Sequence, residues 1–241
     1  SMNPYHQIGS INASARTTPI TVTRTNLLHI HGDFICNSNF DMFNSSTSNQ
    51  GTAHLMFIGE NDSNINANGG NIGAISICKS NSAATVRLLS DCLATTTQNL
   101  ASFWAYNGIF DANSYNFTIT KFRATSSIPS YTAIPTPVNP QIFMGEGNWT
   151  LTGVGVGTSA TTGAIWYNTT TALSLSPETS HLFLTNSSSD DSEIRDASNT
   201  TLAFNNVTKS AGTGKILFHP NTSQKTLINE LKITSAVPIL E

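Results

Sequence analysis

Apolar residues alternate with serine, threonine or asparagine in short phrases along the chain, and most phrases are closed by glycine, asparagine or serine. Alternation with a period of two places every second side chain on one face of an extended strand. Each phrase therefore predicts a half-buried β-strand whose other face carries hydroxyl and amide groups. The clearest phrases are residues 117–120, 149–153, 173–176, 182–186, 201–206 and 232–235.

The first half of the chain contains further strand-length runs that are rich in β-branched and aromatic residues. These runs are residues 20–23, 28–35, 55–59, 74–78 and 85–89. Residues 61–73, rich in glycine and asparagine, are expected to form a loop. One or two helical turns are expected only at residues 223–230, because serine, threonine and asparagine compete with helix formation elsewhere.

The strand phrases of the second half recur at intervals of roughly 20 to 30 residues, which is about one coil of a β-solenoid. A solenoid would bury ladders of the apolar positions and leave the serine, threonine and asparagine positions on its long faces. We predict an all-β fold of the right-handed parallel β-solenoid or β-helix-like type. An antiparallel β-sandwich or jelly roll is the alternative.

Four prolines lie between residues 126 and 140. Proline lacks the backbone N–H that a strand ladder needs, and it disfavours helical backbone in the residue before it. We therefore expect residues 126–140 to form a loop or linker between an N-terminal β segment, residues 1–125, and a C-terminal β segment, residues 141–241. The alternative is one continuous domain.

Composition limits the classes of protein that the chain can belong to. Its 241 residues are 38% hydrophobic and 10% charged, with a formal net charge of −3, which argues for a folded chain rather than a disordered one. The Lys and Arg residues are scattered, so no nucleic-acid partner is expected. No apolar stretch approaches the roughly 20 residues of a membrane-spanning helix, so no membrane insertion is expected either.

Two features bear on the compartment. The first six residues lack the basic and apolar regions of a secretory signal peptide, so none is expected in this chain. Cys36, Cys78 and Cys92 lie at long, irregular spacings that match no metal-binding pattern. The favoured interpretation is three small buried side chains, and a Cys78–Cys92 disulfide is the alternative.

The most specific signal is the segment GIFDANSYNFTI, residues 108–119, followed by FMGEGNWTLTG, residues 143–153. The pair resembles a repeat unit of phage tail and appendage proteins and of bacterial surface adhesins. In that unit, a phrase G-x-F/L-D-A/L-N-G-Y-N-V/L-T precedes a phrase L-x-x-G-x-G-x-W-T-L-T-G. Ser114 stands where the repeat has glycine.

The resemblance implies a β-rich shaft or receptor-contacting module without catalysis, on a virion or an extracellular surface. It implies a homo-oligomer, a trimer if the protein is similar to a tail fibre. It also implies structural roles for five residues in the two phrases. Asp111, Asn113 and Asn116 are expected to cap turns, and Gly145 and Gly147 to form a bulge or a turn with positive φ.

Aromatic residues beside glycine, asparagine and threonine supply the candidate ligand-binding site, composed of Trp104, Tyr106, Trp166 and Tyr167. Aromatic rings stack on pyranose faces while neighbouring amides and hydroxyls bond the sugar hydroxyls. Core packing is the alternative role of these four residues. Trp149 is expected to point inward, because it shares a strand face with the leucine two residues further on.

The one dense acidic group, Asp190, Asp191, Glu193 and Asp196, is the candidate metal site. Carboxylate oxygens are the ligands that Ca²⁺ prefers, so calcium is the only cofactor that the sequence suggests. A solvated loop is the favoured interpretation of the same charges.

Two weaker metal patterns are interpreted as structural. Residues 62–68 have the alternating oxygen ligands of a calcium loop, but they lack its glycine and its glutamate. His29, His31 and Asp33 would share one face of a strand, where we expect solvent-exposed polar side chains rather than metal ligands.

Functional motifs of enzymes are absent from the sequence: it has no nucleophile elbow, no zinc-protease motif, no phosphate loop and no dinucleotide fingerprint. We therefore expect a non-catalytic structural or receptor-contacting component of a phage or cell-surface appendage. A carbohydrate-binding module is the second hypothesis. The third is a polysaccharide-degrading enzyme on a β-helix, which would need only two or three carboxylates in a groove.

Overall fold

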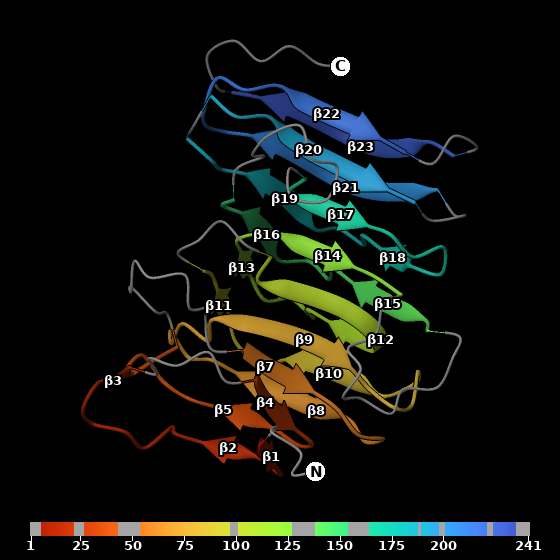
Figure 1. Cartoon of the computed structure of the whole chain (residues 1–241). Coiled ribbons are helices and arrows are strands. Elements are labelled where there is room, and N and C mark those ends of the chain that lie inside the picture. The colour runs from red at the N-terminus through yellow and green to blue at the C-terminus, as the bar shows by residue number, and fades with distance from the viewer. Residues whose placement is uncertain are drawn as a thin grey trace.

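The computed structural model describes residues 6–21, 27–42, 54–96, 101–126, 138–153, 164–187, 189–197, 201–220 and 224–234. In these residues every regular element is a β-strand, β1 to β23, and the strands stack from the N-terminus to the C-terminus (Figure 1). The predicted all-β class is confirmed. The helical turns expected at residues 223–230 are wrong, since β23 occupies Thr226–Ile233.

Three ladders of parallel strands build the stack, and we name them A, B and C. Ladder A consists of β1 (His6–Ile8), β4 (Leu27–Ile30), β7 (His54–Phe57), β9 (Ala74–Cys78), β12 (Phe103–Asp111), β14 (Phe122–Ala124), β17 (Trp166–Asn168), β20 (Ser192–Asp196) and β22 (Ile216–His219). Ladder B consists of β2 (Ile11–Asn12), β5 (Phe34–Ile35), β8 (Ser63–Asn66), β10 (Thr85–Leu88), the second half of β12, β15 (Pro140–Phe143) and β18 (Ser174–Ser176).

Ladder C begins with β3 (Ile20–Thr21) and β6 (Phe40–Asp41), and bridges through Asn71 connect β6 to the strands that follow. These strands are β11 (Cys92–Ala94), β13 (Phe117–Ile119), β16 (Asn148–Leu151), β19 (His181–Leu184), β21 (Leu202–Lys209) and β23. From β1 to β19 the chain visits A, B and C repeatedly in that order, with Asn71 taking the place of a ladder C strand once. All the strand pairs of the described residues are parallel, unlike those of the alternative sandwich.

The core is built from apolar side chains in register from one strand to the next. In ladder A, Leu55, Ile75, Phe103, Phe122 and Trp166 occupy successive paired positions, and all five side chains are buried. Stacking like on like in this way removes a continuous apolar row from water, and this burial is the main favourable term in folding. A single buried cluster extends in sequence from residue 30 to residue 216, across the boundary of the two expected segments.

Most of the proline segment, residues 127–137, lies outside the described residues. Phe122 nevertheless pairs directly with Trp166, although this interval is the longest between partners in ladder A. On the far side of the segment, β15 pairs with β12 in ladder B. The register of both ladders is thus kept across the insertion.

Trp149 of β16 lies at the centre of an aromatic cluster, as its alternation predicts. Its side chain is fully buried, and its ring meets those of Phe103, Phe110 and Phe117 at centroid distances of 6.1, 5.9 and 4.9 Å. Its indole Nε1–H donates to the carbonyl of Met144 at 3.0 Å, so the one polar atom of the side chain is satisfied.

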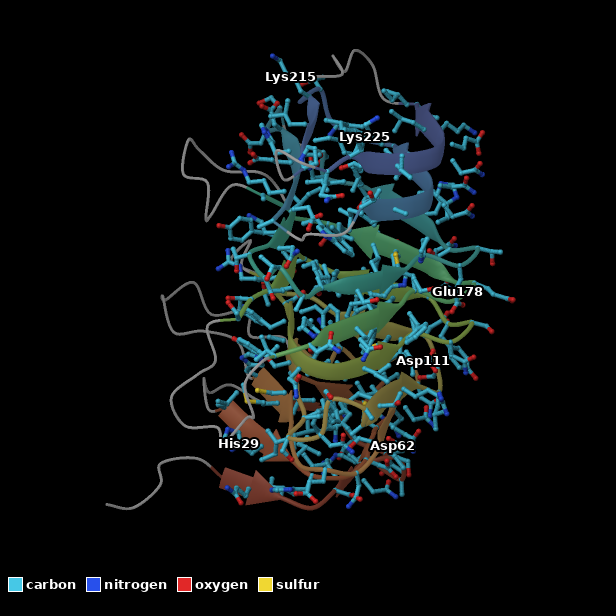
Figure 2. The ribbon with its side chains drawn as sticks, turned by 90° about the vertical axis from the view of Figure 1, so that its right-hand side faces the viewer. His29, Asp62, Asp111, Glu178, Lys215 and Lys225 are labelled. Atoms are coloured by element: carbon cyan, nitrogen blue, oxygen red, sulfur yellow. The ribbon has the colours of Figure 1, made fainter. Side chains whose placement is uncertain are left out.

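Side chains in the turns between strands bond the backbone of turns that are 25 to 32 residues further along the chain. Asp91 Oδ1 accepts from the backbone N–H of Asn116 at 2.9 Å, and Asn116 Oδ1 accepts from that of Asn148 at 3.0 Å. Asp111 caps its own turn by accepting from the N–H of Asn113 at 2.8 Å. Figure 2 shows Asp62, Asp111 and Glu178 along one side of the stack, away from His29.

The two glycines expected to shape the turn before β16 have different reasons to be glycine. Gly145 has a φ of +71°, in the left-handed region, as expected. Gly147 does not have a positive φ; instead, an added Cβ would overlap the carbonyl oxygen of Tyr115. Both positions therefore permit the close approach of this turn to the backbone of residues 113–116.

The structure corrects one further expectation, that of a loop at residues 61–73. Residues 61–73 are not a continuous loop, because β8 (Ser63–Asn66) lies within them and contributes the buried Ile65 to the core. Asp62, just before this strand, accepts a hydrogen bond from the backbone N–H of Thr85 at 2.8 Å, which is a structural contact of the kind interpreted for residues 62–68.

The three cysteines are buried thiols, so the alternative Cys78–Cys92 disulfide is wrong. Burial raises the pKa of the Cys36 thiol to about 12, and burial is also the main cause of a raised pKa at Cys92. Cys36 and Cys92 are therefore neutral small side chains in the core at ordinary pH.

Lysine side chains also enter the interior. Lys79 is fully buried, and its Nζ donates to the carbonyl of Ile58 at 3.0 Å and to Ser63 Oγ at 2.7 Å. Burial lowers the pKa of Lys79 to about 8, against the opposing effect of Asp62 and Asp33.

We expect the contribution of Lys79 to the free energy of unfolding to rise between pH 8 and pH 10.5. Below pH 8 this lysine is protonated in both states, whereas above it the unfolded chain binds more protons until its own lysines titrate near pH 10.5. The Lys79 contribution to the slope is at most about 1.4 kcal/mol per pH unit. Urea denaturation across this range should give a shallower slope for Lys79→Met than for wild type or for Lys232→Met, whose lysine is exposed. Equal slopes for all three proteins would contradict the assignment.

Candidate functional site

Ladder A carries a row of aromatic and cationic side chains on its outer side. Trp104 pairs with Arg123, Arg123 with Tyr167, Tyr167 with Arg195, and Arg195 with His219. These five residues come from the neighbouring strands β12, β14, β17, β20 and β22 and are called the outward row below. Strands lie about 4.8 Å apart, so the row extends about 19 Å along the stack.

Strand alternation explains why this row faces outward. Phe103, Phe122 and Trp166 precede three of its members and point into the core, where all three side chains are buried. Trp104 and Tyr167 follow such residues and therefore point the other way. The first four members are partly exposed and His219 is exposed, so the row offers both rings and donors to a ligand.

The aromatic rings of the row are held by stacking and cation–π contacts. The guanidinium of Arg123 lies 5.3 Å from the centroid of the Tyr167 ring. At the other end, the His54 ring stacks on Trp104 at a centroid distance of 4.8 Å, and His54 Nε2 lies 2.6 Å from Ser76 Oγ. Burial, followed by the nearby His29, lowers the pKa of His54 to about 4, so its ring is neutral at pH 7.

Charged side chains of both signs lie beside the row. Glu193 Oε1 contacts Arg195 Nε and lies 3.1 Å from His219 Nε2, so one carboxylate is placed between two members of the row. Lys121, two residues before Arg123, is buried. Burial and the neighbouring Arg123 lower the pKa of Lys121 to about 8, while Asp190 opposes the shift.

The four aromatic residues singled out by sequence fall into two groups. Trp104 and Tyr167 lie two strands apart in the outward row. Trp166 is fully buried, with its ring stacked on Phe122 at 3.9 Å, and so presents no surface to a sugar. Tyr106, at a register irregularity of β12, is 8% exposed.

Tyr106 belongs to a small second apolar cluster with Met56 and Cys78, against which Trp104 packs. The cluster lies at the same end of the outward row as His54. It gives Trp104 a firm support without enclosing it, because Trp104 keeps part of its surface exposed.

The acidic residues of the candidate calcium site make separate contacts. Asp191 Oδ1 accepts from the backbone N–H of Lys215 at 2.8 Å, Glu193 contacts Arg195, and Asp196 Oδ1 accepts from Asn168 Nδ2 at 2.6 Å. Asp190 acts electrostatically on Lys121. No group of three or more His, Cys, Asp or Glu residues in the described ranges is arranged to hold a metal ion.

His29 and His31 do not share an exposed strand face. His29 is on β4 and 1% exposed, whereas His31 lies after the strand and is exposed. The expectation that His29 faces solvent is wrong, and burial, with a smaller effect of His31, lowers its pKa. Asp33 Oδ1 instead accepts from the backbone N–H of Asn64 at 2.7 Å.

The side chains of the outward row and its neighbours offer groups that can bind a ligand. One contact of a hydroxyl with an imidazole lies beside the row, that of Ser76 with His54, and the Ser76 side chain is fully buried. A neutral imidazole whose pKa is about 4 is also a weak base. The exposed rings and guanidinium groups provide stacking surfaces and charge-assisted hydrogen bonds.

Sequence reasoning missed Arg123, Arg195 and His219 as partners of the aromatic residues. Each of the three residues lies in a short strand, at an alternate position that faces the same side as the outward row. This alternation was the signal in the sequence that could have found them. What the sequence does not specify is the register, which places residues from five separate segments side by side.

Comparisons with protein-family models, with curated proteins and with solved structures find no match. Within the described ranges, no helix has the length and apolar character needed to cross a membrane.

Proposed function

We propose that this protein is a non-catalytic, receptor-contacting component of a phage or cell-surface appendage, and that its outward row binds a glycan. The observation that carries the proposal is the pairing register that places Trp104 and Tyr167 on one outer face with Arg123 between them. Rings of this kind stack on sugar faces, and the arginine between them can donate to sugar oxygens. The site thus requires no catalytic group.

The fold we propose for this role is a right-handed parallel β-solenoid, which would act as the shaft of the module. It is supported by the repeated A, B, C order of the strands and by the buried rows that run along the stack. Such a shaft holds the outward row on strands rather than on loops, so the rings keep their spacing without a ligand. We further propose a homo-oligomer, with a trimer as the expected state, on a virion or an extracellular surface.

A carbohydrate-binding module is the second candidate, favoured by the same outward row. The two candidates differ in assembly: an appendage component is expected to form a stable oligomer, whereas a binding module acts as a monomer. Light scattering combined with size-exclusion chromatography distinguishes them. The polysaccharide-degrading enzyme is not favoured by any contact in the described residues.

We expect the purified protein to bind glycans on an array and to bind them more weakly in Trp104→Ala and Tyr167→Ala. Each substitution removes a stacking surface that supplies roughly 0.5 to 1.5 kcal/mol, which is about a twofold to tenfold loss in affinity. Phe183→Ala is the matched control, because Phe183 is a partly exposed aromatic residue of ladder C that stacks on His181 at 4.0 Å.

Melting temperatures of the three variants establish that each one is folded. Equal glycan binding by wild type, Trp104→Ala and Tyr167→Ala would refute the outward row as the site. Cleavage of a bound polysaccharide by the wild-type protein would refute the non-catalytic role.

A further inference from the structure

We infer that the ligand of the outward row is an acidic glycan, one whose sugars carry carboxylate groups. This inference rests on the proposed function and adds the chemical class of the ligand. The row alternates ring and cation in the order Trp104, Arg123, Tyr167, Arg195. A ligand that matches it must itself alternate apolar ring faces with negative charge.

The spacing of the row repeats. Trp104 and Tyr167 are separated by two strand steps, and so are Arg123 and Arg195, which gives about 9.6 Å between like members. A polysaccharide laid along the stack presents sugar rings and their substituents at regular intervals. It can therefore occupy both ring positions and both arginine positions in one extended conformation.

Arginine is suited to carboxylates at both positions. Its planar guanidinium presents N–H donors in a fork that matches the two oxygens of a carboxylate, and it stacks on aromatic rings at the same time. Arg123 already lies over the Tyr167 ring, so its plane is partly ordered before a ligand arrives. Arg195 is 33% exposed and is oriented through its Nε by Glu193.

The charge balance of this face differs from that of the whole chain. The chain has 14 acidic residues against 11 Lys and Arg residues, whereas on this face Arg123 and Arg195 belong to the row and Lys121 lies two residues before Arg123. Glu193 acts on Arg195, and Asp190 acts on Lys121. The face therefore stays more positive than its surroundings, which favours an anionic ligand.

The test compares two forms of one polymer. Polygalacturonate carries a carboxylate on every sugar, and its methyl ester has the same backbone without the charge. Titration calorimetry with chain-length-matched oligomers should show that the acid binds at least tenfold more tightly than the ester. Raising the salt concentration should weaken binding of the acid and leave binding of the ester unchanged.

Variants identify the groups responsible. Arg123→Gln and Arg195→Gln should each weaken binding of the acid at least tenfold, about 1.4 kcal/mol or more, because each removes a hydrogen bond between two charged groups. Binding of the ester should fall by a smaller factor, because each arginine then loses a hydrogen bond to a neutral sugar oxygen rather than to a carboxylate. Arg87→Gln is the matched control: Arg87 is 50% exposed on ladder B, where its Nε lies 2.8 Å from Asp111 Oδ2, and its loss should change neither affinity.

The outcomes separate the inference from the proposed function. If the acid and the ester bind equally and both depend on Trp104, the row is a neutral-glycan site; the proposed function then stands and the inference fails. If the acid binds but Arg87→Gln weakens it as much as Arg123→Gln does, the binding is non-specific charge attraction and the inference also fails. If neither form binds, the inference and the proposed glycan site are both overturned.

Discussion

Trp149→Ala is expected to unfold the protein well below the melting temperature of wild type, or to prevent its soluble expression. The side chain is fully buried among Phe103, Phe110 and Phe117, so its removal leaves a cavity that the rigid stack of strands cannot fill. A large-to-small change of this kind costs about 3–5 kcal/mol. In a domain of this size the melting temperature should fall by roughly 6–20 °C, measurable by calorimetry.

Two variants control this experiment. Trp149→Phe keeps most of the buried ring and should lose clearly less stability, although it gives up the hydrogen bond to Met144. Trp104→Ala makes the same chemical change on a partly exposed residue and should also cost less. A Trp149→Ala protein that melts with wild type and loses glycan binding would place Trp149 on the surface and reverse the assignment of strand faces.

Gly145→Ala is expected to have the second large effect. A Cβ at this position would overlap the carbonyl oxygen of Asn113 in the preceding coil, so the corner must move before alanine can fit. The φ of +71° adds about 1–2 kcal/mol for any residue with a side chain. Because β16 begins shortly after this turn, at Asn148, the shift would also disturb the strand that carries Trp149. We therefore expect a lower urea midpoint.

Gly9→Ala is the matched control, because an added Cβ there has no heavy atom within 4 Å. It should leave the urea midpoint nearly unchanged. A Gly145→Ala protein as stable as Gly9→Ala would mean that the corner between the two coils is much softer than its geometry indicates.

The strands could be predicted because the alternation of apolar and polar residues is visible within each short segment of the sequence. The burial of Trp149 follows from its parity alone, and so does the outward direction of Tyr167 once Trp166 is assigned to the core. The strand β8 was hidden, because Asn64 and Asn66 resemble loop residues. Both belong to a strand since ladder B pairs them with Arg87 and Ile35, which are distant in sequence.

The candidate site was only half predictable for the same reason. Composition singled out Trp166 and Tyr167 together, yet it does not tell which of two adjacent aromatic residues faces outward. Pairing decides this: Trp166 stands beside Phe122 and Tyr167 beside Arg123. Arg195 joins the outward row because β20 pairs with β17. No pattern within the β20 segment specifies the register of that pairing.

The direct pairing of Phe122 with Trp166 across the longest interval of ladder A has an evolutionary consequence. Lengthening a connection costs little, about 0.6 kcal/mol for each doubling, provided that its two ends stay in register. Segments inserted at the corners can therefore be gained, lost or exchanged while the ladders remain unchanged. The segments that connect the strands can then change in evolution while the strands that support them stay the same.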